Sequence, residues 1–167
     1  MSINRLVLSS PPITKYDYSQ QGLIEEKEVM NNEFSQKMSE ILSLSKEEAT
    51  RLRSNSIKPE HLLLGIIRKG KGCALDILGS LNVNIQEIKE ILERRSSNGP
   101  VADLPFNNNI EMSLSTARIL RFTTLEARSF KSIADTEHLL LAILKEKSNS
   151  VASILSNHNV TYTDVRE

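Results

Sequence analysis

A five-residue motif, Glu-His-Leu-Leu-Leu, occurs twice in the chain, and this duplication constrains the fold more than any other feature. The motif spans Glu60–Leu64 and recurs 77 positions later at Glu137–Leu141. Two related units can bury their apolar faces against each other, so we predict one domain with approximate two-fold symmetry. The apolar positions repeat as well, and the matched core candidates are Ile41, Leu42, Leu62, Leu63, Ile66, Ile77 and Leu78 with Ile119, Leu120, Leu139, Leu140, Ile143, Ile154 and Leu155.

Each unit has the pattern of four helices. Apolar residues recur every three or four positions, and the usual start and stop residues flank these stretches. In the first unit we expect helices from Ser35 to Leu52, Pro59 to Lys69, Cys73 to Leu81, and Asn84 to Arg95, with Asn82 as a left-handed stop. We therefore predict an all-α fold with a flexible N-terminal extension at residues 1–32, a first unit at 33–95, a linker at 96–110 and a second unit at 111–167.

Composition excludes several classes of function. The 21 basic residues balance 21 acidic ones, which disfavours nucleic-acid and anionic-membrane partners. Cys73 is the single cysteine, so no intramolecular disulfide forms, and the chain is too poor in Cys and His for a zinc module. No apolar run approaches the ~20 residues of a membrane span. We expect a cytoplasmic protein with neither metal nor cofactor.

The repeated unit resembles a known family. Its first helix opens with Phe34-Ser35 or Met112-Ser113 and continues through Glu-Glu-Ala or Leu-Glu-Ala, and the duplicated Glu-His-Leu-Leu-Leu follows a loop. This order is similar to the double Clp repeat in the N-terminal domain of Clp-type AAA+ unfoldases, with ClpC the most similar branch, and it covers about residues 30–167. The resemblance implies two tandem four-helix Clp repeats and a non-catalytic docking module for adaptor proteins and substrates. In such assemblies ATPase rings thread proteins into a peptidase.

Two forms of this role stay open. The chain ends inside its last predicted helix, at residues 161–167, whereas the first repeat continues to Arg95. This favours an excised N-terminal part of a longer unfoldase. The alternative is a free-standing Clp-repeat regulator that lacks a motor and competes for unfoldase partners, and the reading frame after Glu167 distinguishes the two.

The resemblance also implies a binding site. In ClpC-like domains, the glutamates that match Glu60 and Glu137 lie in two pockets that bind phosphorylated arginine. A carboxylate pairs well with a guanidinium, and Ser35 and Ser113 are the candidate hydroxyls for the phosphate. The simpler interpretation is that the glutamates stabilise helix dipoles and the serines are N-caps. The preceding loops, Lys58-Pro59 and Asp135-Thr136, also depart from the Gly-Thr common in the family.

Three further motifs are interpreted as structural. Gly65–Lys71 fits the start of a phosphate loop, but Gly72 stands where Ser or Thr must hold magnesium, and Gly65 falls within a predicted helix. His61 and His138 lack a second ligand at metal-binding spacing, so we expect them to fix their loops by hydrogen bonds. Cys73 aligns with Ser150 as a small residue at a helix start, without the partners of a catalytic thiol.

Overall fold

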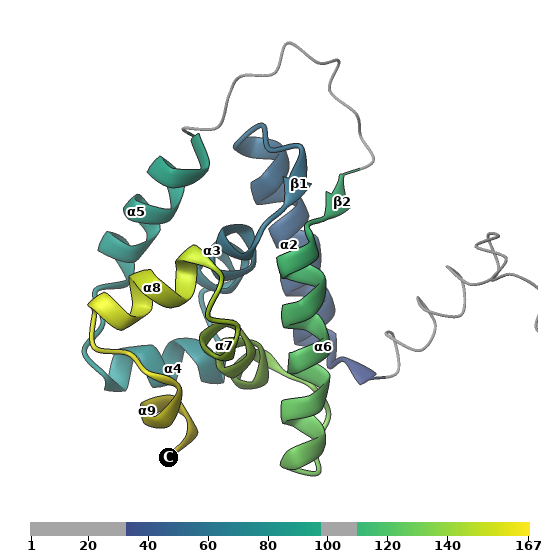
Figure 1. Cartoon of the computed structure of the whole chain (residues 1–167), viewed down its shortest axis with the longest axis vertical. Coiled ribbons are helices and arrows are strands. Elements are labelled where there is room, and N and C mark those ends of the chain that lie inside the picture. The colour runs from purple at the N-terminus through teal and green to yellow at the C-terminus, as the bar shows by residue number, and fades with distance from the viewer. Residues whose placement is uncertain (1–32, 98–109) are drawn as a thin grey trace, which may run out of the picture.

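The computed structural model of the chain describes residues 33–97 and 110–167, and these residues confirm the all-α prediction (Figure 1). The predicted extension at residues 1–32 lies outside the described residues. The elements are α2 (Gln36–Arg51), β1 (Ser56–Ile57), α3 (Pro59–Lys69), α4 (Cys73–Ser80), α5 (Ile85–Ser97), β2 (Glu111–Met112), α6 (Leu114–Ser129), α7 (Thr136–Lys145), α8 (Ser150–Asn157) and α9 (Tyr162–Arg166).

The helix boundaries follow the local signals in the sequence. The Ser35 hydroxyl accepts a hydrogen bond from the backbone N–H of Met38 and caps α2. Gly70 ends α3 in the left-handed conformation at φ 71°, and Asn82 adopts φ 57° after α4. The prediction for the fourth helix was two residues too short, because α5 continues past Arg95 to Ser97.

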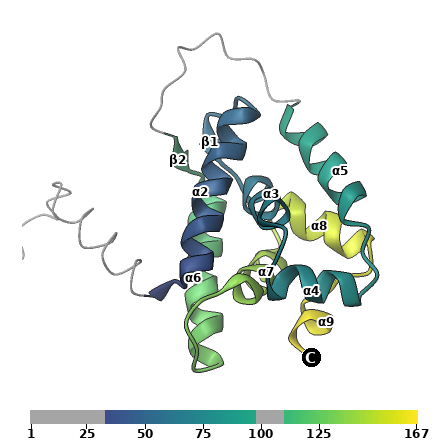
Figure 2. The ribbon, with the colours of Figure 1, turned by 180° about the vertical axis from the view of Figure 1, so that it is seen from behind.

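The eight helices of the described residues form two related sets, α2 to α5 and α6 to α9, with α3 and α7 at the centre. Within each set the first two helices pack as a pair, α2 on α3 and α6 on α7. The short third helices then cross over, because α4 packs on α7 and α8 packs on α3 (Figures 1 and 2). Each half of the chain therefore covers the central helix of the other half.

The short segments that precede α2, α3, α6 and α7 also pair between the two halves. β1 and β2 pair in parallel, with Ile57 opposite Met112, and an isolated parallel bridge joins Phe34 to Ala134. These two contacts are equivalent, because Phe34 and Ala134 are the counterparts of Met112 and Ile57 in the duplicated sequence. Strands this short carry no alternating pattern, so the helical periodicity did not predict them.

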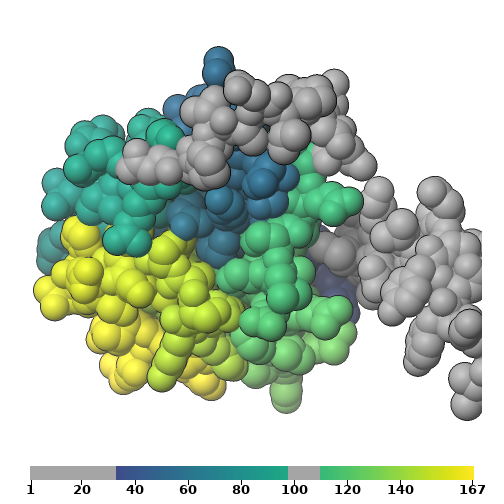
Figure 3. All heavy atoms as spheres, turned by 45° about the horizontal axis from the view of Figure 1, so that its top comes forward, coloured from purple at the N-terminus to yellow at the C-terminus, as the bar shows by residue number. Residues whose placement is uncertain are grey.

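The core is aliphatic and extends across both halves. The predicted core residues are buried, except that Leu42 and Ile77 are only partly buried against the rest. Figure 3 shows the C-terminal part of the chain, in yellow, directly beside the teal atoms of the first half. There α8 contacts α5. None of the helices within the described ranges has the length and apolar character needed to cross a bilayer.

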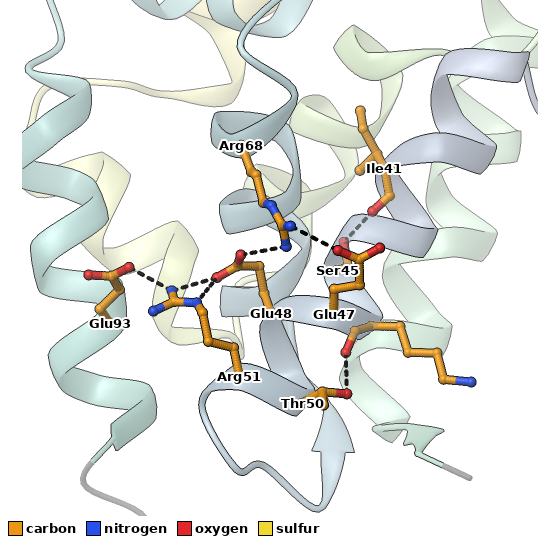
Figure 4. Close-up of polar contacts among 9 residues, drawn as sticks. Ile41, Ser45, Glu47, Glu48, Thr50, Arg51, Arg68 and Glu93 are labelled. Carbon is orange, nitrogen blue, oxygen red and sulfur yellow. Dashed lines mark hydrogen bonds and ion pairs between the residues drawn. The ribbon is translucent and has the colours of Figure 1, made fainter. Parts of the chain in front are cut away.

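Both helix pairs contain a buried carboxylate. Glu48 on α2 accepts hydrogen bonds from Arg51 at 2.6 Å and from Arg68 on α3 at 3.1 Å, and Arg51 also reaches Glu93 on α5 (Figure 4). The counterpart Glu126 on α6 accepts from Lys145 on α7 at 2.6 Å and from Tyr162 at 2.9 Å. Lys145 and Tyr162 lower the pKa of Glu126, although burial alone would raise it.

Candidate functional site

The two predicted carboxylates occupy matching places in the first turns of the central helices. Glu60 follows Pro59 in α3, and Glu137 follows Thr136 in α7. Both side chains are half-buried, and each lies where a helix N-terminus stabilises negative charge. The structure thus places Glu60 and Glu137 on equivalent helix starts that are open enough to meet a ligand.

The predicted serines lie opposite these helix starts, but across the boundary between the halves. The backbone N–H of Ser35 donates to the carbonyl of Ala134 at 2.9 Å, just before α7. Equivalently, the backbone N–H of Ser113 donates to the carbonyl of Ile57 at 2.9 Å, just before α3. Ser35 therefore belongs with the helix start of Glu137, and Ser113 with that of Glu60. Each candidate site is built from both repeats, a pairing that the sequence did not specify.

The two histidines, at equivalent positions of the two repeats, hold the loops before α3 and α7. The His61 Nδ1 atom accepts from the backbone N–H of Lys58 at 2.9 Å, and the His138 Nδ1 atom accepts from that of Asp135 at 3.1 Å. The predicted loop-fixing role is thereby confirmed. Burial lowers the pKa of His61 to about 4, so its ring is neutral at pH 7. Across the described residues, no cluster of three or more His, Cys, Asp or Glu could hold a metal ion.

Glu137 lies next to the start of α4. Its carboxylate accepts a hydrogen bond from the Thr136 hydroxyl at 3.3 Å, and that hydroxyl also accepts from the backbone N–H of Ala74. Burial raises the pKa of the Cys73 thiol, and the nearby charge of Glu137 raises it further. This direction is opposite to the one that activates a nucleophilic thiol. Cys73 therefore remains a thiol at neutral pH.

Glu60 has a different neighbour. Its carboxylate accepts a hydrogen bond from the hydroxyl of Ser150, the first residue of α8 and the counterpart of Cys73. No corresponding hydrogen bond joins Cys73 to Glu137 among the described contacts. One oxygen of Glu60 is thus already engaged within the protein.

A pocket of about 470 Å³ opens beside Ser35. Lys37, Lys69 and Lys71 line it, together with Asp135 and the glycine before α4. Lys37 lies 3.7 Å from the Asp135 carboxylate, and Lys69 pairs with Glu40 at the pocket edge. Glu137 does not line this pocket but lies in the first turn of the helix that Asp135 caps. The three lysines form no linear motif, because they lie in α2, at the end of α3 and in the loop before α4, and so they could not be identified from the sequence.

The near-match to a phosphate loop is part of a packed helix. Gly65 lies inside α3 and is buried against α2, where a Cβ atom would lie 2.5 Å from the Ser45 hydroxyl and 2.9 Å from the Ile41 carbonyl. Only Gly70 and the residues after it leave the helix. The glycine at position 65 is required by the close approach of two helices, which explains it without a nucleotide.

Comparison with known proteins places this arrangement in a family. The family described as the Clp repeat (R) N-terminal domain matches residues 33–166. The chain is 31% identical over 140 residues to the chaperone protein ClpB of Oceanobacillus iheyensis, covering 83% of this chain and 17% of that protein. It is 29% identical over 140 residues to the negative regulator of genetic competence ClpC/MecB of Bacillus subtilis, again covering 83% and 17%.

Solved structures give the same fold. The Hsp104 N-terminal domain from Candida albicans aligns with a TM-score of 0.67 at 18% identity, covering 80% of this chain and 86% of that one. A protein from a malarial secretion system aligns with a TM-score of 0.68 at 21% identity, covering 80% and 90%. The chain spans about one sixth of the length of the curated relatives cited above. With two matched four-helix units and a family match across nearly all described residues, the chain belongs to the Clp repeat N-terminal domain family.

Proposed function

We propose that this chain is a substrate- and adaptor-docking domain of a ClpC-like, ATP-dependent unfoldase that acts in the cytoplasm. It binds adaptor proteins and protein substrates without transforming them, while an AAA+ ring and a peptidase in the full-length assembly do the mechanical and chemical work. The family match over residues 33–166 supports this role, as do relatives named as Clp chaperones and regulators.

We further propose that the ligand includes phosphorylated arginine. The observation that carries this proposal is the placing of Glu60 and Glu137 at two equivalent helix starts, each beside a serine from the other repeat. A phosphorylated guanidinium group offers N–H donors to a carboxylate and phosphate oxygens to hydroxyl, lysine and helix N-terminal donors. The glutamates and the serines both belong to these helix starts, and the lysines line the pocket beside Ser35.

The test is calorimetric titration with an arginine-phosphorylated peptide and with the same peptide unmodified. We expect saturable binding of the phosphorylated peptide alone, and loss of that binding in the variant carrying Glu60→Ala and Glu137→Ala. Glu90→Ala, an exposed carboxylate on α5, is the matched control and should bind normally. Circular dichroism checks that all variants keep their helicity.

Equal affinity for both peptides would reject recognition of the phosphate. Unchanged affinity in the double variant would reject the assigned glutamates. The docking role itself is tested separately, by pull-down of a purified Clp adaptor with the immobilised chain. Saturable adaptor capture supports that role even if the phosphorylated peptide does not bind.

A further inference from the structure

The two halves place different side chains at equivalent positions around their candidate sites. Lys37, Lys69 and Lys71 line the pocket beside Ser35. In the second half, the counterparts of these lysines are Ser115, Glu146 and Ser148, and both serine hydroxyls donate to the Glu146 carboxylate. The symmetry of the backbone is therefore not matched by symmetry of chemistry.

In the second half, the counterpart of Lys69 is Glu146, so a carboxylate of the protein takes the position of a lysine. Its side chain is buried, with 8% of the residue exposed. It accepts hydrogen bonds from the Ser115 hydroxyl at 3.4 Å and the Asn149 side-chain amide at 3.5 Å, and another from Ser148. The two serine hydroxyls are donors that a bound anion would need at this place, and both already point at an internal anion, while the Asn149 amide donates mainly to the backbone carbonyls of Ile143 and Glu146.

The two candidate serine hydroxyls also differ, because the Ser35 hydroxyl is available to donate to a ligand and the Ser113 hydroxyl is not. The Thr116 hydroxyl donates to the carbonyl of Ile57 at 2.7 Å, and the Ser113 and Thr116 oxygens lie 3.0 Å apart. Each hydroxyl has a single hydrogen, so Ser113 must donate its own to Thr116. The counterpart of Thr116 is Met38, which has no hydroxyl. In the described contacts Ser35 only accepts, from the Met38 N–H at 3.1 Å, so its hydrogen can be donated to a ligand.

The net formal charge does not distinguish the two candidate sites. They differ in where the charged groups lie and in how exposed those groups are. The pocket beside Ser35 holds three lysines with Glu40 and Asp135, and the counterparts of these two acids are Arg118 and Lys58. Arg118 and Lys58 are exposed to water, whereas Glu146 is buried. Water screens exposed charges more than buried ones, so Glu146 repels an incoming phosphate more strongly than either exposed cation attracts it at the same distance.

We propose that the chain has one anion-binding site, not two: the pocket lined by Ser35, Lys37, Lys69 and Lys71 takes a phosphorylated side chain, and Glu146 occupies the equivalent place beside Ser113. This inference rests on the proposed function, because it states which of the two symmetric sites works. The ligand is the phosphorylated side chain of a protein substrate, with its phosphate held by the lysines and the Ser35 hydroxyl.

The experiment combines calorimetry with two-dimensional NMR of the isotope-labelled full chain, using an arginine-phosphorylated peptide and inorganic phosphate as separate probes. We expect one equivalent of peptide per chain and amide shifts confined to residues 35–37 and 69–73. The variant with Lys37→Ala and Lys71→Ala should bind roughly tenfold more weakly. The matched variant with Ser115→Ala and Ser148→Ala should bind as the natural chain does.

A second matched pair tests the carboxylates. Glu137→Ala should weaken peptide binding, and Glu90→Ala, at an exposed carboxylate on α5, should leave it within about twofold, since a twofold change is under 1 kcal/mol. Two equivalents of bound peptide, or amide shifts at residues 113–116, would overturn the single-site inference and leave the proposed function intact. Phosphate shifts in the pocket without peptide binding would support the anion site and reject phosphorylated arginine. Absence of shifts with either probe would overturn the inference.

Discussion

The backbone N–H of Ser35 donates a 2.9 Å hydrogen bond to the carbonyl of Ala134, a residue of the other repeat. The N–H of Ala134 in turn donates to the carbonyl of Glu33 at 3.0 Å. These bonds tie the start of α2 to the start of α7, and the equivalent pairing of β1 with β2 ties α6 to α3. The two repeats are therefore held together at the same points that form the candidate sites.

Cutting the chain between the repeats should leave the domain assembled. A protease site introduced within residues 98–109 separates the chain into halves that still share the strand pairings and the crossed α4 and α8 contacts. After cleavage we expect both halves to co-elute in gel filtration with unchanged helicity. The first half expressed alone should lose most of its helicity, because the faces of α3 that α8 covers would be exposed. Separate elution of two folded halves would contradict the exchanged packing.

Gly65 should not tolerate even a methyl group. In Gly65→Ala the new Cβ would lie 2.9 Å from the backbone carbonyl of Ile41, so α2 and α3 must move apart. We expect a loss of about 1–3 kcal/mol in the free energy of unfolding, measured by urea denaturation. The matched control is Gly79→Ala on α4, where no atom lies within 4 Å of the added Cβ. That variant should gain up to about 1 kcal/mol from helix propensity, and a similar gain in Gly65→Ala would refute the close approach.

His61 should make stability fall in mild acid. Its pKa in the folded protein is lowered to about 4, whereas the unfolded chain has an ordinary histidine near 6.5. Between these pH values the unfolded state binds more protons than the folded state. The contribution of neutral His61 to the free energy of unfolding is therefore fully present above pH 6.5 and is lost as the pH falls toward 4. The slope reaches about 1.4 kcal/mol per pH unit.

The measurement is the free energy of unfolding from pH 7 to pH 4, compared with the His61→Gln variant. Carboxylates contribute equally to both proteins, so the difference in slope reports His61. We expect the variant to show the shallower dependence. Parallel curves over this range would show that the imidazole is not kept neutral by burial.

Lys145 should contribute more to the free energy of unfolding at neutral pH than in acid. Lys145→Met leaves Glu126, which is 2% exposed, with only the Tyr162 hydroxyl as a side-chain partner from another helix. We expect a loss of about 1–3 kcal/mol at pH 7, since a buried carboxylate is costly without its cation. The pKa of Glu126 is lowered in the natural protein, so its contribution is present above the ordinary value of 4.5 and is lost as pH falls through the folded pKa.

In Lys145→Met the pKa of Glu126 should rise, so the carboxyl can be buried neutral in acid. The stability difference between the variant and the natural chain should therefore shrink as pH falls from 7 to 4. Lys147→Met, at an exposed neighbouring position, is the matched control and should have little effect at either pH. A difference that is constant with pH would mean that Lys145 contributes only through the packing of its aliphatic chain.

Helix positions could be predicted from sequence because each depends on local chemistry. Ser35 as an N-cap, Pro59 at a first turn and Asn82 in a left-handed conformation all act within one turn of their own residue. The duplicated motif then predicted the approximate two-fold symmetry of the domain. The exchange between halves could not be predicted, because it depends on two-residue strands and on which helix covers which, and neither leaves a period in the sequence.

The candidate site was predictable in part. The repeated motif singled out Glu60 and Glu137, and the structure places them at equivalent helix starts; their binding role, implied by the family resemblance, stays a prediction. The lysines of the pocket and the buried Glu146 were not identified, since they lie at the ends of three different helices and differ between the repeats. These positions differ between the repeats, so the identities that mark the duplication do not include them.

The crossed packing of α4 on α7 and α8 on α3 also has an evolutionary reading. An ancestral half with a single repeat would have had a central helix with one uncovered face, which only another copy of itself could cover. The natural solution is a two-fold homodimer, in which each subunit lends its short helix and strand to the other. The present chain is then such a dimer joined into one polypeptide. Joining freed its two halves from having identical side chains, so that Lys69 and Glu146 could diverge at one ancestral position.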